Sequence, residues 1–468
     1  MNHPNRPERA VVIGGSMAGL LAAAALVPHF DRVTVVERDR LPAGPESRKG
    51  VPQSHHLHVL MPGGQHAIEA LLPDFGAELL AEGAVPVDEA NMLFPAGWSR
   101  PFRPRSRHRL LSCSRLLVES VVRRRVIPQV NLRQGVEVTG LVVQHDRVRG
   151  VRLRPRGGGE SLRDWSLAAD LVVDASGRTS RGPEWLESLG LGRPAETRID
   201  SFLGYASRQY ALPPDSPIGQ RAVMLMAKPP LEARTGYLFP IDGGRWIVTL
   251  AGAGRDYPPT DEAGFLEFAR SLRDPVIHEL IKDAEPLTPI RGHRRTENQR
   301  RHYERMRPSP DGLLVLGDAA CAFNPVYGQG MSVAAQTAAA LAGKLAGRAY
   351  GPGSTRAMQR LVVGCNSGAW LVATEQDLRY PTTEGARPGR QTRLMHRYLD
   401  RVLAAAIFDE PANAAWFDVM MLLQPPKSLF RPRVLVTALR GQRDGLVARP
   451  DLGSPSAEPP RMVTEAPR

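Results

Sequence analysis

The hydrophobic pattern at the start of the chain predicts a buried strand, a glycine turn and a helix. Residues 10–13 form an apolar run, the turn covers residues 14–19, and residues 20–26 are again entirely apolar. Short continuous apolar runs beside a turn are typical of strands buried in a parallel sheet. A second, mostly apolar strand at residues 33–36 ends at an acidic residue, Glu37. The pattern therefore predicts a βα unit that leads into a neighbouring strand.

The glycine turn has the spacing of a dinucleotide site. Gly14 permits a tight turn, and Gly19 lets the helix approach the strand, so that a pyrophosphate can bind at the helix N-terminus. Glu37 follows Gly19 by 18 residues, where an acid can bind the adenosine ribose hydroxyls. Ser16 replaces the usual second glycine, so its side chain must point away from the phosphates. An ordinary turn is the alternative. The predicted dinucleotide contacts are Gly14, Ser16, Met17, Ala18, Gly19, Glu37 and Arg38.

A second motif lies about three hundred residues further on. An apolar strand at residues 313–316 delivers Asp318 at its end, and a glycine-rich turn then opens a helix predicted over residues 332–345. The amides of a helix N-terminus stabilise negative charge, which reduced flavin carries at one edge of its ring. Asp318 can accept hydrogen bonds from ribityl hydroxyls, and Gly328 and Gly330 let the main chain approach a flat ring closely. The alternative is an ordinary turn that starts a helix. It explains the glycines but not the order in which Asp318, Pro325 and the glycines follow one another.

This second motif resembles the class A flavin monooxygenases of the para-hydroxybenzoate hydroxylase fold. The residues that carry the resemblance are Gly317-Asp318-Ala319, Asn324-Pro325 and Gly328-Gln329-Gly330-Met331. The resemblance implies that Asp318 binds the ribityl chain and that Pro325, Gly328, Gln329 and Gly330 lie near the flavin ring. It also implies that Arg115 reaches the ribityl chain and the pyrophosphate. The further residues that it assigns to cofactor binding are Asp174, Gly177, Gly317, Asp318, Pro325, Gly328, Gly330 and Met331.

Four stretches resemble, more narrowly, the flavin epoxidases of polyether ionophore biosynthesis, the lasalocid and monensin epoxidases among them. They cover residues 48–58, 170–177, 246–249 and 323–327. The resemblance implies FAD as cofactor, NADPH or NADH as reductant and O2 as co-substrate. It also implies that reduced flavin forms a C4a-hydroperoxide that epoxidises an olefin of a polyketide or polyene. Two departures are His55, where the group has arginine, and Ser176-Gly177, where the family has an Asp-Gly pair linked to both cofactors.

The predicted fold class is α/β, with a Rossmann-like FAD-binding domain, an inserted mixed or antiparallel β-sheet substrate domain and a C-terminal helical region. The FAD-binding domain is expected from three segments, and the substrate domain from two. The predicted boundaries are residues 1–70, 105–180 and 295–345 for the FAD-binding domain, 71–104 and 181–294 for the substrate domain, 346–440 for the helical region and 441–468 for a disordered tail.

Four stretches separated by turns, residues 201–210, 222–227, 236–240 and 245–250, predict antiparallel strands that form a substrate sheet over the flavin. Positions two apart, such as Met224 and Met226, must share a face. A wall of methionine and aromatic side chains would suit a long apolar substrate, although such a stripe more often packs a sheet against its neighbour. The candidate pocket residues are Phe202, Tyr205, Met224, Met226, Phe239, Trp246 and Phe323.

Composition limits the remaining possibilities. The chain has 468 residues, is 42% hydrophobic and has no apolar run as long as the roughly 20 residues of a membrane span. Arg6 and Arg9 before the first apolar run resemble a secretory signal, but the glycine turn interrupts that run. Three cysteines are too few for a disulfide framework. We therefore expect a mature N-terminus and a cytoplasmic protein.

The net charge of +13 does not predict nucleic-acid binding, because the arginines are spread through strands and loops without interleaved aromatics. Two local clusters, residues 100–109 and 291–301, could attract an anionic cofactor, a carboxylate substrate or an acyl-carrier protein that presents an apolar substrate. The alternative, with at least equal weight, is that both clusters are solvated loops without a partner. His55, His56, His58 and His66 lack a carboxylate or cysteine that would complete a metal site, so no metal is predicted.

Other activities remain open at this point. A phenol hydroxylase would use an ionisable pair above the flavin to deprotonate its substrate, whereas an apolar pocket favours epoxidation. A halogenase is disfavoured, because the chain has no Trp-x-Trp pair and only five lysines. A flavin reductase or dehydrogenase that does not use oxygen, or a flavoprotein that only binds a pathway partner, belongs to a different class.

Overall fold

The computed structural model describes residues 8–88, 92, 109–156, 164–348 and 350–440. A five-stranded parallel sheet forms the centre of the larger lobe, with strand order β17-β9-β1-β2-β5. Its strands are β1 (Arg9–Ile13), β2 (Arg32–Glu37), β5 (Asn131–Gln134), β9 (Leu171–Asp174) and β17 (Leu313–Val315). Strands β1, β9 and β17 are almost entirely apolar because side chains on both faces are buried.

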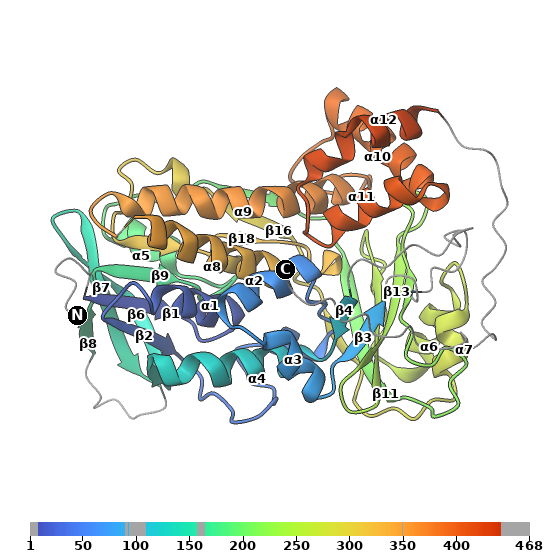
Figure 1. Cartoon of the computed structure of the whole chain (residues 1–468), viewed down its shortest axis with the longest axis horizontal. Helices are drawn as coiled ribbons and strands as arrows, with labels where there is room; N and C mark the ends of the chain where they lie inside the picture. The colour runs from blue at the N-terminus through green and yellow to red at the C-terminus, as the bar shows by residue number, and fades with distance from the viewer. Residues whose placement is uncertain (1–7, 89–91, 93–108, 157–163, 349, 441–468) are drawn as a thin grey trace, which may run out of the picture.

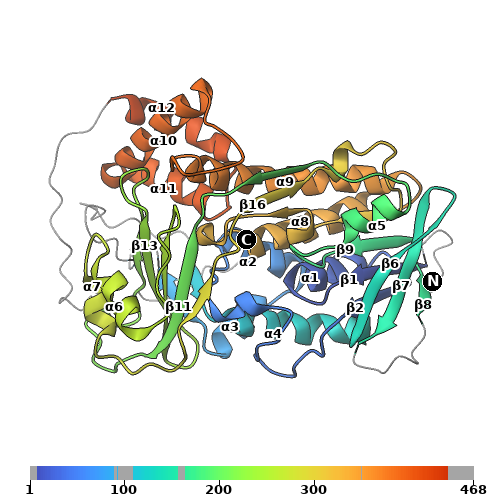
Figure 2. The same cartoon turned by 180° about the vertical axis from the view of Figure 1, so that it is seen from behind.

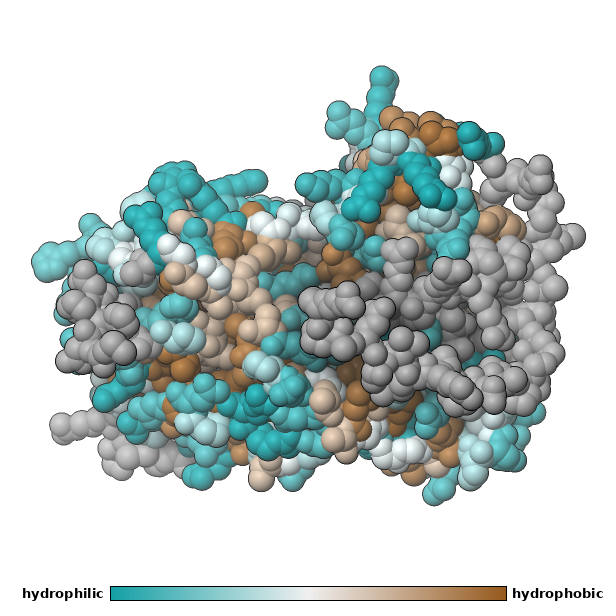
Figure 3. Space-filling view, viewed as in Figure 1, coloured by the Kyte–Doolittle hydropathy of each residue, from teal (hydrophilic) through white to brown (hydrophobic). Residues whose placement is uncertain are grey.

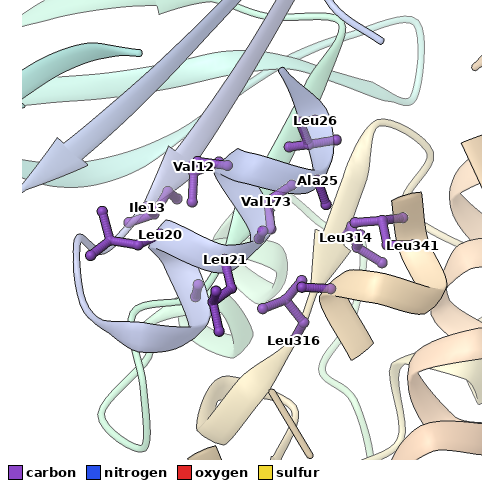
Figure 4. Close-up of a cluster of buried hydrophobic side chains, with 14 of the residues drawn as sticks. Val12, Ile13, Leu20, Leu21, Ala25, Leu26, Val173, Leu314, Leu316 and Leu341 are labelled. Carbon is purple, nitrogen blue, oxygen red and sulfur yellow. The ribbon is translucent and has the colours of Figure 1, made fainter. Parts of the chain in front are cut away.

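Both faces of this sheet are covered. Helices α1 (Met17–Leu26), α2 (Pro62–Leu71), α4 (Arg115–Val126) and α8 (Gly330–Gly347) pack together on one side. The antiparallel sheet of β6 (Val136–Gln144), β7 (Arg147–Pro155) and β8 (Trp165–Ala168) packs its strands β6 and β7 against the other side (Figures 1 and 2). Figure 4 shows the core between α1, the sheet and α8, where Leu21, Leu314 and Leu341 come from segments far apart in sequence.

A second five-stranded sheet lies at the other end of the molecule (Figure 1). It is antiparallel, with strand order β12-β13-β14-β11-β15. Its strands are β11 (Gly204–Ala211), β12 (Val223–Leu225), β13 (Arg234–Ile241), β14 (Arg245–Gly252) and β15 (Arg291–His293). Helices α6 (Glu262–Arg270) and α7 (Val276–Ile281) cover one of its faces. Strands β3 (Val85–Asp88) and β4 (Arg109–Ser112) contribute to the core on the opposite face.

Smaller elements connect these parts. Strands β10 (Glu196–Ile199), β16 (Asn298–Arg301) and β18 (Cys321–Ala322) form a three-stranded sheet, and helices α3 (Phe75–Ala81) and α5 (Gly182–Ser188) lie at the periphery. The long helix α9 (Ser354–Asp377) runs from the larger lobe toward a helical lobe of α10 (Arg390–Phe408), α11 (Glu410–Met420) and α12 (Pro432–Leu439) (Figures 1 and 2). Brown apolar side chains interrupt the teal surface over this helical lobe in Figure 3.

The predicted mixed α/β fold is confirmed. The βα unit, the strand before Gly317 and the helix that follows Gly330 lie where the apolar pattern predicts them, and the antiparallel strands between residues 201 and 250 form one sheet. The parallel sheet draws its strands from all three predicted segments, whereas the domain boundaries stay a prediction. The predicted tail at 441–468 lies outside the described residues, as do residues 93–104 of the proposed substrate domain. None of the described helices is both long and apolar enough to cross a membrane.

Candidate functional site

One cavity of about 1230 Å³ lies along the carboxyl ends of the parallel strands and continues under the antiparallel sheet. Carboxyl ends of parallel strands are where open α/β sheets bind their ligands. Typical small-molecule pockets measure roughly 300–1000 Å³, so this cavity can hold a cofactor together with a substrate. The predicted site residues that line it are Gly14, Ser16, Met17, Ala18, Glu37, Arg38, Arg115, Tyr205, Gly177, Met224, Met226, Phe239, Gly317, Asp318, Phe323, Pro325, Gly328, Gly330 and Met331.

The glycine turn after β1 is closely packed. Gly14 has φ +103, which L side chains rarely adopt, and a Cβ there would lie 2.7 Å from the carbonyl oxygen of Ala175. A Cβ on Gly19 would lie only 1.8 Å from the carbonyl oxygen of Gly14. Gly19 does not line the cavity, and its role is therefore to bring α1 against the turn. Helix α1 then begins at the cavity with no side-chain cap on its N-terminus.

The side chain of Ser16 points toward α4. Its hydroxyl donates to Glu119 Oε2 at 3.0 Å and accepts from Arg115 Nη2 at 2.9 Å. Arg115 also forms an ion pair of 2.9 Å with Glu119, four residues later on the same helix. These contacts occupy the hydroxyl on the α4 side, so the amides of Met17 and Ala18 can face the cavity. The serine at the second glycine position is thereby explained.

Arg48 joins the same buried cluster. Its guanidinium lies 3.2 Å from Glu37 Oε1 and donates to Glu119 Oε1 at 3.2 Å, and its side chain is 7% exposed. Burial raises the pKa of Glu119, but Arg115 and Arg48 outweigh that effect and the pKa lies below its usual value. Glu37 accepts from the Gly15 amide at 2.7 Å, so its carboxylate holds the turn while it also lines the cavity.

Asp318 lies at the end of β17, where Gly317 has φ +58. Within the described part of the chain its carboxylate has no hydrogen bond or ion pair to a protein group, yet it lines the cavity. Burial raises the pKa of Asp318, while the charges of Arg178 and Arg115 act in the opposite direction. A carboxylate in this position can accept hydrogen bonds from ligand hydroxyls.

The loop before α8 is held from behind by a buried carboxylate. Asp377, at the end of α9, accepts from Asn298 Nδ2 at 2.6 Å, from Asn324 Nδ2 at 3.0 Å and from the Tyr327 hydroxyl at 2.7 Å. Burial raises the pKa of Asp377 to about 6, although hydrogen bonds from Asn324 and Tyr327 lower it. The network fixes Pro325 against the cavity and positions the uncapped N-terminus of α8 beside it.

The antiparallel sheet forms the apolar wall opposite this loop. Its strands alternate, so Met224, Tyr237 and Phe239 face the cavity while their neighbours pack against α6 and α7. Trp246 belongs to the second set and is 1% exposed, which corrects its assignment to the substrate pocket. Phe202 also lies outside the cavity lining, because its ring packs under the guanidinium of Arg255.

Two further predicted site residues do not line the cavity, and for Asp174 this corrects the predicted contact. Asp174 is 1% exposed and lies outside the cavity lining, because its carboxylate accepts from the Ser176 hydroxyl at 2.6 Å and from the Ser180 hydroxyl at 2.5 Å. It holds the turn that presents Gly177. Gln329 lies between two lining glycines, so its predicted place near the ring stays a prediction, while its own side chain is buried and does not line the cavity.

The histidine stretch supplies neutral imidazoles. Burial and the neighbouring His293 lower the pKa of His56 to about 3, and burial and Arg115 lower that of His58 to about 3. His56 Nδ1 lies 2.9 Å from the Ser207 hydroxyl, and His58 Nδ1 lies 3.0 Å from the carbonyl oxygen of His56. In the described ranges, His, Cys, Asp and Glu side chains do not gather into a group that could hold a metal ion.

Sequence reasoning missed several residues that shape the site. Glu119 could have been found, because an acid four residues after Arg115 on a helix is a recognisable pair. Arg48 begins the stretch at residues 48–58 that carries the epoxidase resemblance, but that resemblance assigns it no contact. Tyr327 and Asp377 lie 50 residues apart, and no local pattern connects them.

FAD fits the residues present. The cavity joins two uncapped helix N-termini, which favour anionic groups, and it exposes the unpaired carboxylate of Asp318 to ligand hydroxyls. Main chain free of side chains lines it at Gly14 and Gly328. The helix N-termini match the pyrophosphate and the anionic ring edge, the carboxylate of Asp318 matches the ribityl hydroxyls, and the bare main chain matches the flat ring.

Comparisons with known proteins agree with this fit. The family model described as FAD binding domain matches residues 8–375. The chain is 32% identical over 425 residues to Protein Rv3254 of Mycobacterium tuberculosis, which covers 88% of this chain and 89% of that protein. It is 29% identical over 344 residues to the kynurenine 3-monooxygenase of Salinispora tropica, 70% of each chain. The solved structure of the flavin-dependent brominase Bmp2 has a TM-score of 0.62 at 15% identity, covers 93% of this chain and 98% of that chain, and shows likeness of fold alone.

Proposed function

Because the chain belongs to the FAD binding domain family of flavin monooxygenases and FAD is its cofactor, we propose that it epoxidises olefins of a polyketide or polyene substrate. The observation that carries this proposal is the apolar wall of Met224, Met226 and Phe239, which faces the Pro325 loop and its Phe323 across the cavity. An olefin is electron-rich without deprotonation, so such a wall meets the needs of epoxidation. The narrower sequence resemblance to polyether epoxidases supports the same choice.

When bound, FAD supplies the redox chemistry by which a nicotinamide reductant and O2 yield one oxygen atom for the substrate. The protein's own residues bind and orient it. Asp318 and Arg115 would hold the ribityl chain and pyrophosphate, and the amides at the start of α1 would bind the pyrophosphate. The apolar wall excludes water from the reacting face. Because their pKa values are lowered to about 3, His56 and His58 are uncharged at neutral pH and add no positive charge to the site.

The test supplies purified protein with FAD, NADPH or NADH, isotopically labelled O2 and a set of linear polyenes and phenols. Mass spectrometry of a labelled epoxide would establish the proposal. Label in a hydroxylated phenol would keep the monooxygenase and replace the epoxidase. Oxidation of nicotinamide without labelled product from any substrate of the set would instead favour an oxygen-independent flavoprotein.

Aromatic hydroxylation is the second candidate, and one observation favours it. Tyr327 lines the cavity and its hydroxyl donates to Asp377, whose pKa is raised by burial to about 6. This pair could take a phenol proton when Asp377 is ionised, so hydroxylation would be lost as pH falls through about 6. Tyr327→Phe should lower kcat for a phenol by at least about tenfold and remove that pH dependence, because a relay of this kind is typically worth 10²–10⁴-fold. An epoxidase should keep kcat within about twofold and show no such profile.

Presentation of the substrate on an acyl-carrier protein stays a proposal as well. Of the two arginine clusters, residues 100–108 of the first lie outside the described residues. In the second cluster, Arg300 pairs with Glu304 at 3.1 Å and Arg301 donates to the Ala319 carbonyl, so these two are engaged within the fold. Turnover of a free substrate at high salt would count against the carrier.

A further inference from the structure

The cavity does not end at the antiparallel sheet but continues into the helical lobe, between α9, α10 and α11. We infer that this extension, here named the apolar arm, binds the long hydrocarbon part of the substrate while the reacting double bond lies at the Pro325 loop. The inference rests on the proposed function for the reaction, but the binding of a hydrocarbon chain can be measured without it.

Helix α10 contributes a continuous apolar stripe to the arm. Met395, Leu399, Leu403 and Ile407 follow one another at intervals of four residues, so they lie on one face of the helix. All four line the cavity, and all are partly exposed despite being apolar. The opposite side of the helix carries exposed Leu394 and a series of arginines, which contact solvent instead.

Helices α11 and α9 supply the facing walls. On α11 the lining side chains are mostly aromatic or sulfur-containing, and on α9 Leu371 remains 46% exposed although it faces the cavity. Methionine and aromatic walls adapt to flexible apolar ligands. The lining residues on and just after α11 are Asn413, Trp416, Phe417, Val419, Met420 and Met421.

Most of this stripe lies outside the folding core of the lobe. That core lies between α10, α11 and α12 around Val402, Val434 and Ala438, and of the stripe Leu399 packs against it. Met395, Leu403, Ile407 and the facing Met420 lie outside that cluster. Partly exposed large apolar side chains gathered in one concave region mark a binding site for an apolar partner.

The arm is preformed by polar ties at its edge. Arg379, at the end of α9, donates to Asp400 Oδ1 at 2.8 Å and to the carbonyl oxygen of His396 at 3.3 Å. These contacts fix α10 relative to α9. Tyr327 and Tyr380 line the passage from the Pro325 loop toward the arm, so both parts belong to one continuous cavity.

A hydrocarbon chain is the occupant that this lining favours. Most of the lining of the arm is apolar, so a polar ligand would recover only part of its hydration there. The polar side chains on and beside α9, α10 and α11 that line it are Glu375, Gln376, Arg379, Asp400 and Asn413. Each buried methylene should tighten binding about fourfold. Affinity should therefore rise steeply with chain length until the arm is filled.

The test measures binding of octanol, decanol and dodecanol to the oxidised, FAD-loaded enzyme by equilibrium dialysis, without reductant. Each step adds two methylenes, so we expect about 15-fold tighter binding per step in the wild type. Leu403→Asp places a charge in the arm and should weaken dodecanol binding at least tenfold. Leu394→Asp is the matched control on the exposed side of α10 and should change nothing.

Leu403→Trp fills the arm without adding charge and should flatten the chain-length series, which keeps the test valid if the aspartate variant does not fold. FAD content and thermal unfolding identify variants that are simply misfolded. Equal dodecanol affinity in the wild type and in a folded Leu403 variant would overturn the inference. If dodecanol binds the variant as tightly as the wild type but the enzyme still forms an epoxide, the apolar arm is refuted and the proposed function stands. If binding depends on chain length but no oxygenated product forms, the proposed function is refuted and the apolar arm stands.

Discussion

Replacing Gly19 by alanine tests whether close packing of α1 on the glycine turn creates the pyrophosphate site. The added Cβ would lie 1.8 Å from the Gly14 carbonyl oxygen and 2.9 Å from its carbon. Both are backbone atoms, so no side chain can rotate away. Real Cβ atoms stay at least 3.0 Å from such neighbours, so the contact must open by 3.0 − 1.8 = 1.2 Å or more.

A shift of that size affects both stability and cofactor affinity. Overpacking of this kind costs about 1–3 kcal/mol. The same shift moves the amides at the start of α1, and a hydrogen bond to a charged group contributes about 1.5–3 kcal/mol. If one such bond is lost, the Kd for FAD should rise by roughly 10- to 150-fold. We therefore expect Gly19→Ala to be purified largely without FAD and to unfold at a lower temperature.

The assay combines flavin absorbance per protein with thermal unfolding at increasing FAD. Gly343→Ala is the matched control, because Gly343 lies exposed within α8 and nothing lies within 4 Å of the added Cβ. That change should gain about 0.5–1 kcal/mol of stability and leave FAD binding unchanged. A Gly19→Ala protein that binds FAD with the wild-type Kd would refute the placement of the pyrophosphate at this turn.

Three further changes address the remaining parts of the site. Asp318→Ala should release FAD, with a Kd raised by at least about tenfold, since a hydrogen bond to a charged group is lost; a protein that stays yellow at wild-type stoichiometry would contradict the ribityl contact. Glu119→Gln leaves Arg115 and Arg48 without their shared carboxylate, so it should lower the free energy of unfolding by about 3 kcal/mol in urea titrations. A loss below about 1 kcal/mol would contradict the buried cluster. Trp246→Ala should cost about 3–5 kcal/mol of stability but leave the substrate KM unchanged, and an altered KM in the folded variant would return this residue to the pocket.

The parts of the fold that the sequence predicts correctly are those with a local cause. A strand buried on both faces must be apolar throughout, and Gly14 must adopt a positive φ that few other residues tolerate. These demands appear as short motifs at residues 10–19 and 313–331. The three-stranded sheet of β6, β7 and β8 was not predicted, because it is partly polar and its role depends on the parallel sheet that it covers.

The site errors have a common physical origin. Trp246 and Phe239 both look like pocket residues, and they lie on strands that pair with each other. Which face of the sheet meets the cavity is decided by α6 and α7, which bury one set of alternating side chains. The sequence specifies the alternation but not the face. Asp174 was misplaced for a similar reason, since its partners Ser176 and Ser180 are visible in the sequence but their hydrogen bonds are not.

The apolar arm shows the same limit on a larger scale. A four-residue repeat from Met395 to Ile407 predicts only that α10 buries one face. Whether that face meets a core, another chain or a ligand depends on the spacing between α9 and α10, which Arg379 sets through Asp400 and the His396 carbonyl. Closer approach of the two helices would turn the same stripe into ordinary core and close the cavity. The contacts of Arg379 at the edge therefore help to keep open the space that the apolar side chains line.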